Sequence, residues 1–103
     1  MEKDTSILEL LDRLSVELSK DFIIVDFWAG NLCAIGIIRG SINGRLVYMS
    51  TFNQSPNCYY YEYEVADSVK SIEKGDYTVV RKGQVTHFSA MVEVAKTHLY
   101  NEK

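Results

Sequence analysis

Apolar residues recur at helical spacing near both ends of the chain and at strand spacing in between. Near the N-terminus the apolar positions are Ile7, Leu11, Leu14 and Leu18. Near the C-terminus they are Phe88, Met91, Val92, Ala95 and Leu99. Each set forms one stripe on a helix surface, which is typical of an amphipathic helix packed on a core. We therefore expect one helix that ends near Lys20 and another that begins after Val85.

Capping residues place the starts of both helices. Ser6 and Glu9 have the spacing of a capping box, in which the hydroxyl accepts a backbone N–H and the carboxylate reaches back to another. Thr86 precedes the second apolar stripe, and we expect it to be the N-cap there.

Five segments between the helices have strand character, because they are rich in β-branched and aromatic residues and are separated by turn residues. They are Phe22–Trp28, Leu32–Arg39, Arg45–Phe52, the tyrosine-rich run that ends at Val65, and Tyr77–Arg81. Ala66–Asp76 is weakly patterned, and we expect a loop or one short helical turn. Strands flanked by helices favour the α+β class. The sequence thus predicts a single α+β domain over residues 1–103, with an antiparallel meander of four to five strands between terminal helices.

The dipeptide Asn43-Gly44 is the strongest hairpin signal in the chain. A two-residue turn there places Ile38 opposite Met49 and puts Ala34 and Gly36 on the face of Met49. Small residues on that face would let a helix approach closely. The other face also carries apolar residues, so either both faces are covered within the monomer or one of them meets a partner.

The segment from Asn57 to Val65 reads Asn-Cys-Tyr-Tyr-Tyr-Glu-Tyr-Glu-Val and is the most informative in the chain. Side chains in a strand alternate between the two faces of the sheet. The row that is apolar enough to sit on a core comprises Tyr59, Tyr61, Tyr63 and Val65. The opposite row comprises Tyr60, Glu62 and Glu64. A phenol beside two negative charges suits contact with a basic partner surface.

Composition and charge narrow the functional classes. The 103 residues carry a net charge of −3, and their 47% hydrophobic and 24% charged residues are ordinary for a globular domain. The basic residues are scattered, so we expect no nonspecific binding to nucleic acid, which needs clustered lysine and arginine. The chain has 7 tyrosines, a residue common in binding surfaces because it combines large area with a polar tip.

Acidic residues outside the tyrosine strand extend the candidate binding surface. The expected partner-binding residues are Tyr60, Glu62, Glu64, Asp26, Asp67, Glu73 and Asp76. Such a surface complements a basic protein and would speed its capture by electrostatic steering, with tyrosines as the desolvated anchors. The alternative is that these charges only keep a small protein soluble.

Two residues of the first strand segment have two interpretations each. Asp26 is its only charge inside an apolar run. It is either a buried hydrogen-bond acceptor at a functional site or a marker of the wet face of the strand, because burying an unpaired carboxylate is costly. Trp28 is either a binding aromatic on a loop or a residue that closes one end of the core.

Cys33 and Cys58 are the only cysteines, and both fall in strand-like runs. A single disulfide is geometrically possible. Two buried free thiols in a reducing cytoplasm fit better, because small secreted domains usually carry several disulfides. The first residues lack the pattern of a signal peptide, and no apolar run is long enough to cross a membrane. We therefore expect a cytoplasmic protein without a membrane partner.

The sequence offers little support for catalysis or metal binding. His87 and His98 lie eleven residues apart, about 16 Å along a helix axis, and no paired-cysteine or zinc-protease motif is present. We expect no catalytic residue, metal or cofactor. Glu62 and Glu64 lie about 7 Å apart on one strand face, which would suit acid–base chemistry. Alternating glutamates are also what an ordinary solvent-exposed strand carries.

The segments Asp26–Ile37 and Leu46–Phe52 carry a family resemblance. With the size, acidity and helix–sheet–helix plan of the chain, they resemble the small immunity proteins that neutralise bacterial toxins of contact-dependent inhibition systems. This family is diverse and shares no diagnostic motif, so no residue role is carried over. The resemblance implies a cytoplasmic inhibitor that binds a toxin domain, often a nuclease, and covers its active site. Many toxin nucleases are basic, and an acidic inhibitor would suit them.

Two other classes of function stay open. One is a small-ligand-binding or regulatory domain, with a pocket between sheet and helix where Trp28, Tyr48 and Phe52 converge. The other is a small hydrolase that uses Asp26, Glu62 or Glu64. A deep pocket with a converging carboxylate would favour these classes, whereas a flat or convex acidic face would favour the inhibitor.

Overall fold

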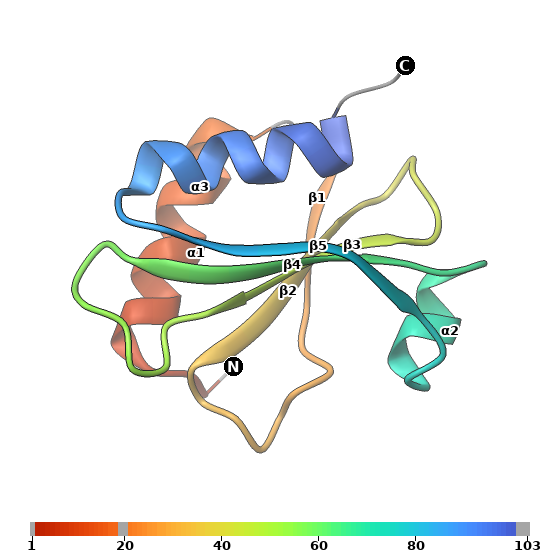
Figure 1. The fold of residues 1–103 in the computed structure, drawn as a ribbon, viewed down its shortest axis with the longest axis horizontal. Coiled ribbons are helices and arrows are strands. Elements are labelled where there is room, and N and C mark those ends of the chain that lie inside the picture. Colours follow the sequence, from red (N-terminus) through yellow and green to blue (C-terminus); the bar gives the residue numbers. More distant parts are fainter. Residues whose placement is uncertain (1, 19–20, 101–103) are drawn as a thin grey trace.

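The computed structural model describes residues 2–18 and 21–100 of the chain. Its elements are α1 (Thr5–Glu17), β1 (Phe22–Val25), β2 (Ala34–Arg39), β3 (Arg45–Ser50), β4 (Tyr59–Val65), α2 (Val69–Glu73), β5 (Thr78–Val85), α3 (Phe88–Ala95) and the π-helical turn η1 (Lys96–Tyr100). The strands form one sheet in the order β1-β2-β3-β4-β5, each antiparallel to its neighbours (Figure 1). The α+β class and the antiparallel meander between terminal helices are therefore confirmed.

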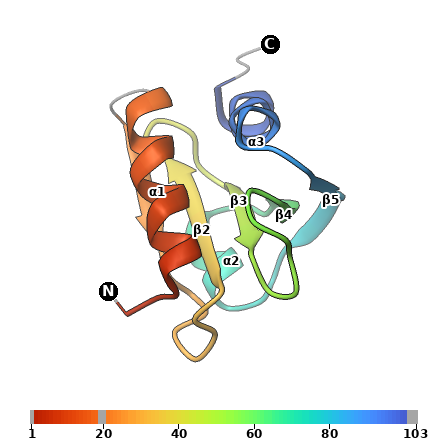
Figure 2. The same ribbon diagram turned by 90° about the vertical axis from the view of Figure 1, so that its left-hand side faces the viewer.

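The core lies between one face of the sheet and the two terminal helices. Figures 1 and 2 show α1 and α3 over the same face, which we call the helix face, and α2 against the opposite one, the far face. The strand residues buried in this core are Ile35, Ile37, Val47, Met49, Tyr59, Tyr61 and Tyr63. The helices contribute Ile7, Leu10, Leu11, Leu14, Leu18, Met91, Val92, Ala95 and Leu99. Three tyrosines of the first row and both helical stripes thus pack as their spacing predicts.

Both terminal helices begin at caps that differ from those expected. The side chain of Asp4 caps α1, because its carboxylate accepts the backbone N–H of Ser6 at 3.0 Å and the Ser6 hydroxyl at 2.6 Å. Ser6 therefore donates to the cap and forms no capping box with Glu9. His87, and not Thr86, is the N-cap of α3, and its side chain makes no capping hydrogen bond.

Several element boundaries also differ from those expected. β1 ends at Val25 and β3 at Ser50, whereas β2 begins only at Ala34. α1 ends at Glu17, and the expected end at Lys20 lies outside the described residues. The short helical turn expected between the last two strands is present as α2.

The β2–β3 hairpin has a different register from the expected one. Met49 pairs with Ile35 instead of Ile38, so Ile35 faces the helices. Gly36 pairs with Tyr48, and both lie on the far face. The expected faces of β2 are therefore reversed, because the connection to β3 is wider than a two-residue turn.

Asp21 and the chain after β4 hold this wider connection. The Asp21 carboxylate accepts the hydroxyl of Ser41 at 2.6 Å, and its backbone carbonyl accepts the N–H of Gly40 at 2.8 Å. Gly44 has a φ of 79°, and its carbonyl accepts the N–H of Ala66 at 2.9 Å. Its positive φ is therefore used in a loop that bonds to two other segments.

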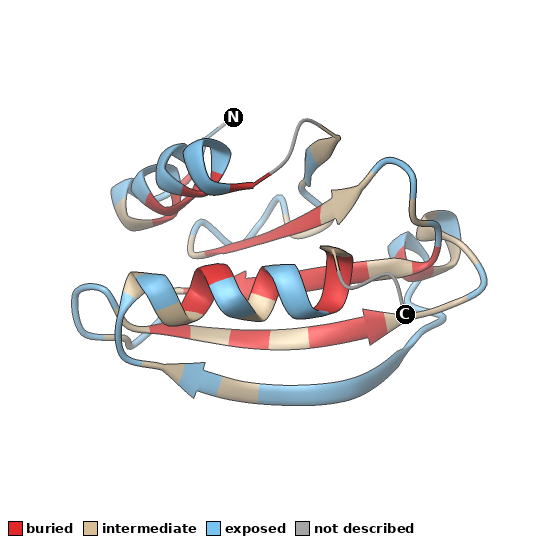
Figure 3. Cartoon of the chain, turned by 90° about the horizontal axis from the view of Figure 1, so that it is seen from above, coloured by how far each residue is buried: buried red, intermediate tan, exposed pale blue. Residues whose placement is uncertain are grey.

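β5 is longer than expected and forms an exposed edge of the sheet (Figure 3). We expected a strand over Tyr77–Arg81, but β5 continues through Gly83. Gly83 lies opposite Tyr61, and a Cβ atom there would lie 3.1 Å from the Tyr61 hydroxyl oxygen. The glycine gives space to this tyrosine and does not end the strand.

Gly36 admits an indole ring onto the far face. The loop between β1 and β2 returns over this face, where a Cβ atom on Gly36 would lie 2.8 Å from the Trp28 ring and 3.1 Å from the Leu46 side chain. We expected small residues to let a helix approach. The close neighbour is instead Trp28, which is half-buried on the far face and lies outside the helix-face core.

Replacing Gly36 with alanine should lower the free energy of unfolding by about 1–3 kcal/mol, because the rigid indole has to move. Gly30→Ala is the matched control, since nothing lies within 4 Å of a Cβ atom there and a change under about 0.5 kcal/mol is expected. Urea unfolding followed by the fluorescence of Trp28 measures both. Equal midpoints for the two variants would contradict the tight contact.

Candidate functional site

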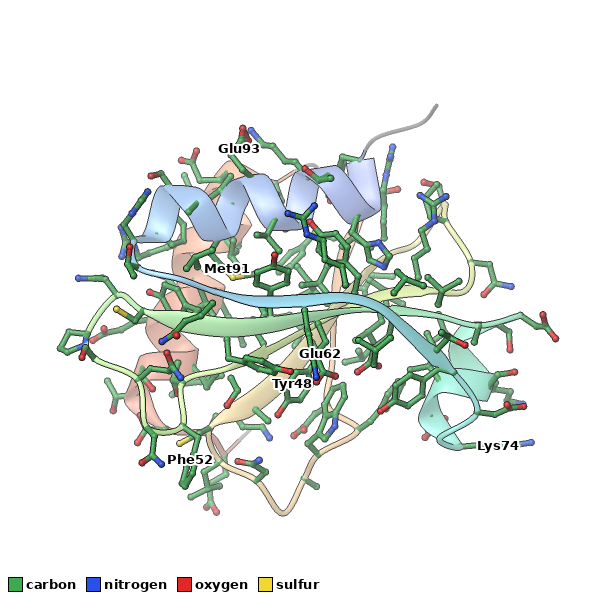
Figure 4. All side chains as sticks on the ribbon, in the orientation of Figure 1. Tyr48, Phe52, Glu62, Lys74, Met91 and Glu93 are labelled. Carbon is green, nitrogen blue, oxygen red and sulfur yellow. The ribbon has the colours of Figure 1, made fainter. Side chains whose placement is uncertain are left out.

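Six side chains gather on the far face, which we call the aromatic–carboxyl cluster. They are Trp28 from the β1–β2 loop, Tyr48 from β3, Tyr60, Glu62 and Glu64 from β4, and Tyr77 just before β5. Figure 4 shows Tyr48 and Glu62 on the side of the sheet away from Met91 and the helix α3. The alternation of β3 and β4 puts these side chains on one face, and Gly36 leaves the space that brings Trp28 over it.

Three of the four aromatic rings of the cluster form a continuous row. The ring centroids of Trp28 and Tyr48 lie 5.0 Å apart at an interplanar angle of 63°, and those of Tyr48 and Tyr60 lie 6.2 Å apart at 74°. These are edge-to-face arrangements, which aromatic pairs prefer. The row fixes the orientation of Tyr60 beside the carboxylates.

Tyr60 and Glu62 form a hydrogen-bonded pair on the half-exposed part of the face. The Tyr60 hydroxyl donates to Glu62 Oε2 at 2.6 Å. This hydrogen bond, with smaller contributions from burial and the Glu62 charge, raises the pKa of Tyr60 to about 12. Within residues 2–18 and 21–100, neither Glu62 nor Glu64 forms an ion pair with a lysine or arginine. Lys82 is the cross-strand neighbour of Glu62 on β5, but it forms no ion pair with Glu62.

Glu64 is buried, so the expectation that it lies on an exposed face is wrong. Its side chain is 1% exposed, and its Oε1 atom has no hydrogen-bond partner. Burial, followed by the charge of Glu62 and a hydrogen bond to it, raises the pKa of Glu64 from 4.5 to about 7. The alternation places Glu64 on the correct face, but α2 and the start of β5 cover that end of it. Leu46, the cross-strand neighbour of Glu64, is 0% exposed, and Ile72 of α2 is 3% exposed.

The backbone of Glu64 connects the cluster to the opposite face of the sheet. His98 Nε2 lies 3.1 Å from the carbonyl oxygen of Glu64, so this nitrogen carries the hydrogen and donates it. The His98 ring stacks on Tyr63 at 4.4 Å and 8°. Burial lowers the pKa of His98, which is consistent with a neutral ring inside the core.

Asp26 is occupied by a contact inside the molecule. The Lys3 ammonium, whose side chain is 0% exposed, lies 2.8 Å from Asp26 Oδ1 and donates to the carbonyl oxygens of Trp28 at 3.1 Å and Asn31 at 2.8 Å. Asp26 also accepts the backbone N–H of Trp28 at 3.2 Å. Neither interpretation of Asp26 from sequence included this partner, because Lys3 is more than twenty positions away. Asp26 therefore holds the loop that carries Trp28.

The three remaining acidic candidates lie around α2. Asp67, Glu73 and Asp76 are exposed. Asp67 and Asp76 line one hollow of about 210 Å³ together with Tyr77, a member of the cluster. Lys70 and Lys74, on and after α2, add positive charge near these carboxylates.

The two cysteines line a hollow away from the aromatic–carboxyl cluster. Cys33 and Cys58 are free and half-buried, so the expectation of two buried thiols is only partly met. Both line a hollow of about 440 Å³ between the start of α1 and the loop after β3, together with Asp4 and Glu9. Among the described residues, no group of three or more His, Cys, Asp or Glu side chains is arranged to hold a metal ion.

The expected ligand pocket between sheet and helix does not form from the expected residues. Trp28 and Tyr48 meet, but on the far face, and Phe52 is 63% exposed. The hollow beside Glu62 has a volume of about 310 Å³ and is lined by β5 residues from Val79 to Lys82. Glu64 is not among its lining residues.

Comparisons with known proteins identify no relative of this chain. No family model matches it, and neither the curated proteins nor the solved structures include a significant match. In the described part of the chain, none of the helices has the length and apolar character needed to cross a membrane.

Replacing Glu64 with glutamine should stabilise the fold at pH 8 by about 1–3 kcal/mol and have little effect at pH 5. The pKa of Glu64 is higher in the folded state, so the folded chain binds more protons than the unfolded chain between pH 4.5 and about 7. Stability from this group is therefore lost as the pH rises through that window. Urea unfolding at both pH values, with the exposed Glu93→Gln as control, measures the difference. An equal effect at pH 5 and pH 8 would exclude a raised pKa.

Replacing Asp26 with asparagine should destabilise the fold by about 1–3 kcal/mol, because the buried Lys3 ammonium loses its countercharge. Asp12→Asn on the exposed side of α1 is the matched control and should change stability little. Thermal unfolding of both variants tests this role, and an unchanged melting temperature for Asp26→Asn would refute it.

Proposed function

We propose that this chain is a binding protein that captures a cationic protein partner on its far face, in the manner of an immunity protein that inhibits a bacterial toxin domain. The observation that carries the proposal is the Tyr60–Glu62 pair. Its phenol and carboxylate are bound to each other at 2.6 Å and lie half-exposed on the sheet face that α1 and α3 leave uncovered. A preorganised aromatic and acidic pair of this kind suits a desolvated anchor in a protein interface.

Charge around the cluster favours a basic partner. Glu62, Asp67 and Asp76 lie near Tyr77, and no lysine or arginine among the described residues pairs with them. Their field is partly offset by Lys70 and Lys82. The partner that fits best is therefore one whose basic residues reach the centre of the cluster, where burial strengthens electrostatic interactions.

The geometry favours binding over hydrolysis. Asp26 is held by Lys3 and by the backbone N–H of Trp28, so it does not join Glu62 as the second carboxyl group of an acid–base pair. The carboxyl groups of Glu62 and Glu64 are hydrogen-bonded to each other, whereas a glycosidase holds its two carboxyl groups apart around the scissile bond.

Reversing the charge of Glu62 alone should weaken partner binding by about tenfold to a hundredfold. The partner to test is the protein encoded immediately upstream of this chain, with titration calorimetry as the measurement and survival of cells that express both proteins as the functional readout. The same reversal at Glu64 is unsuitable, because it would bury a lysine. Glu62→Lys is compared with Glu93→Lys, which makes the same change of charge on α3, away from the far face (Figure 4).

Thermal unfolding of both variants separates binding from folding, and Glu62→Gln provides a milder change should Glu62→Lys be unstable. We expect Glu93→Lys to bind as the wild type does. Equal losses of affinity for the two variants would mean that the effect comes from net charge alone. Undiminished binding by a folded Glu62→Lys variant would rule out the far face as the interface.

A further inference from the structure

We propose that the aromatic–carboxyl cluster is a receptor for one arginine side chain of the partner, whose guanidinium group pairs with the carboxyl groups of both Glu62 and Glu64. This inference rests on the proposed function and specifies the contact at its centre. It identifies the partner by its chemistry, a planar organic cation, and identifies the residues that recognise it.

The first reason is the unsatisfied oxygen of Glu64. Its Oε1 atom is buried and has no hydrogen-bond partner, although nearly all buried polar atoms in proteins have one. The side chain is 1% exposed and lies next to Glu62, to which it is hydrogen-bonded. A donor that enters beside Glu62 would satisfy this oxygen. The described residues supply no third ligand for a metal ion there, so an N–H donor is the matching group.

The second reason is the pairing of two carboxyl groups with aromatic rings. A guanidinium group has several N–H donors in one plane, so it can reach two acceptors at once, and it also packs well on aromatic rings. Tyr48 is the cross-strand neighbour of Glu62. The negative charges of Glu62 and Glu64 contribute to raising the pKa of Tyr48 and of Tyr77, after the larger effect of burial. A lysine ammonium is a strongly hydrated point charge and fits such a site less well.

The third reason concerns the proton of the carboxyl pair. Glu64 faces Glu62 on its own strand, Tyr48 on β3, and Tyr77 and Val79 at the start of β5. On α2, Ile72 is buried while Lys70 and Glu73 are exposed, and on the helix face His98 touches only the Glu64 backbone carbonyl. Burial and the neighbouring Glu62 raise the pKa of Glu64 to about 7, so a large share of the molecules carry a proton on Glu64 near neutral pH. Entry of a guanidinium group would release that proton to solvent and leave two carboxylates on one cation.

The test uses N-acetyl-arginine-N-methylamide as the probe, with the citrulline analogue as a neutral control of the same shape and the lysine analogue as a second cation. Two-dimensional NMR of the intact chain follows the indole N–H of Trp28 and the side-chain carboxyl carbon of Glu64. We expect the arginine probe to shift both signals and the citrulline probe to shift neither. Arginine should bind several-fold more tightly than lysine, and about tenfold more weakly at pH 5.5 than at pH 8, since the proton then competes.

The variant Glu62→Gln should lose at least fivefold of the affinity for the arginine probe, whereas Glu93→Gln should retain it. Shifts that are equal for arginine and citrulline, equal for arginine and lysine, or absent from Trp28 and Glu64 would overturn the inference. If the probe fails while Glu62→Lys still loses the upstream partner, the arginine receptor is wrong and the proposed interface stands. If the probe binds but the partner binds the Glu62→Lys variant as tightly as the wild type, the proposed function fails.

Discussion

The alternation of β4 between the two faces of the sheet is the constraint on which the rest of the structure depends. Tyr59, Tyr61 and Tyr63 fill the core under the helices, so Tyr60, Glu62 and Glu64 have to point to the far face. A shift of one residue would exchange the two rows and bury two carboxylates among α1, α3 and the core. The hydroxyl of Tyr63 adds to this constraint, because it donates to the carbonyl oxygen of Val94 in α3 at 2.9 Å. Packing of the tyrosines on the helix face therefore determines that the phenol and carboxyl groups lie on the far face.

Sequence patterns predicted the features of this fold that depend on neighbouring residues. The stripes of the terminal helices and the tyrosine row were correct, because burial of one face follows directly from the period of the sequence. The β2–β3 register was wrong, because Asp21 and Ala66 bind the connection from outside the hairpin. The environment of Glu64 was also wrong. Alternation determines the face on which a side chain lies, but not whether a later segment such as α2 covers it. Likewise, nothing near Asp26 in the sequence indicates its ion pair with Lys3.

Glu64 and His98 make the stability of the fold depend on pH in opposite directions. The raised pKa of Glu64 lowers the stability of the fold as the pH increases from 4.5 to about 7. The lowered pKa of His98 acts in the other direction, because the unfolded chain takes up a proton first as the pH falls through 6.5. The two effects offset each other in the range where they overlap. Since His98 bonds only the Glu64 backbone, the side-chain carboxyl can release its proton to solvent when a cation binds, without breaking the contact that joins η1 to β4.

The buried carboxyl group of Glu64, beside the half-exposed Glu62, destabilises its own domain above neutral pH, and this cost is informative about function. A protein that needed only solubility would keep Glu62 and Glu64 exposed, where they cost little. Here, Gly36 admits Trp28, Lys3 holds the loop that carries it, and Glu64 is buried beside Val79 of the neighbouring strand with one oxygen unsatisfied. These separate features all act on one small region of the far face. A cation supplied by another molecule is the simplest addition that would satisfy both carboxylates at once, and it would place a destabilising buried carboxyl group at the centre of an interface.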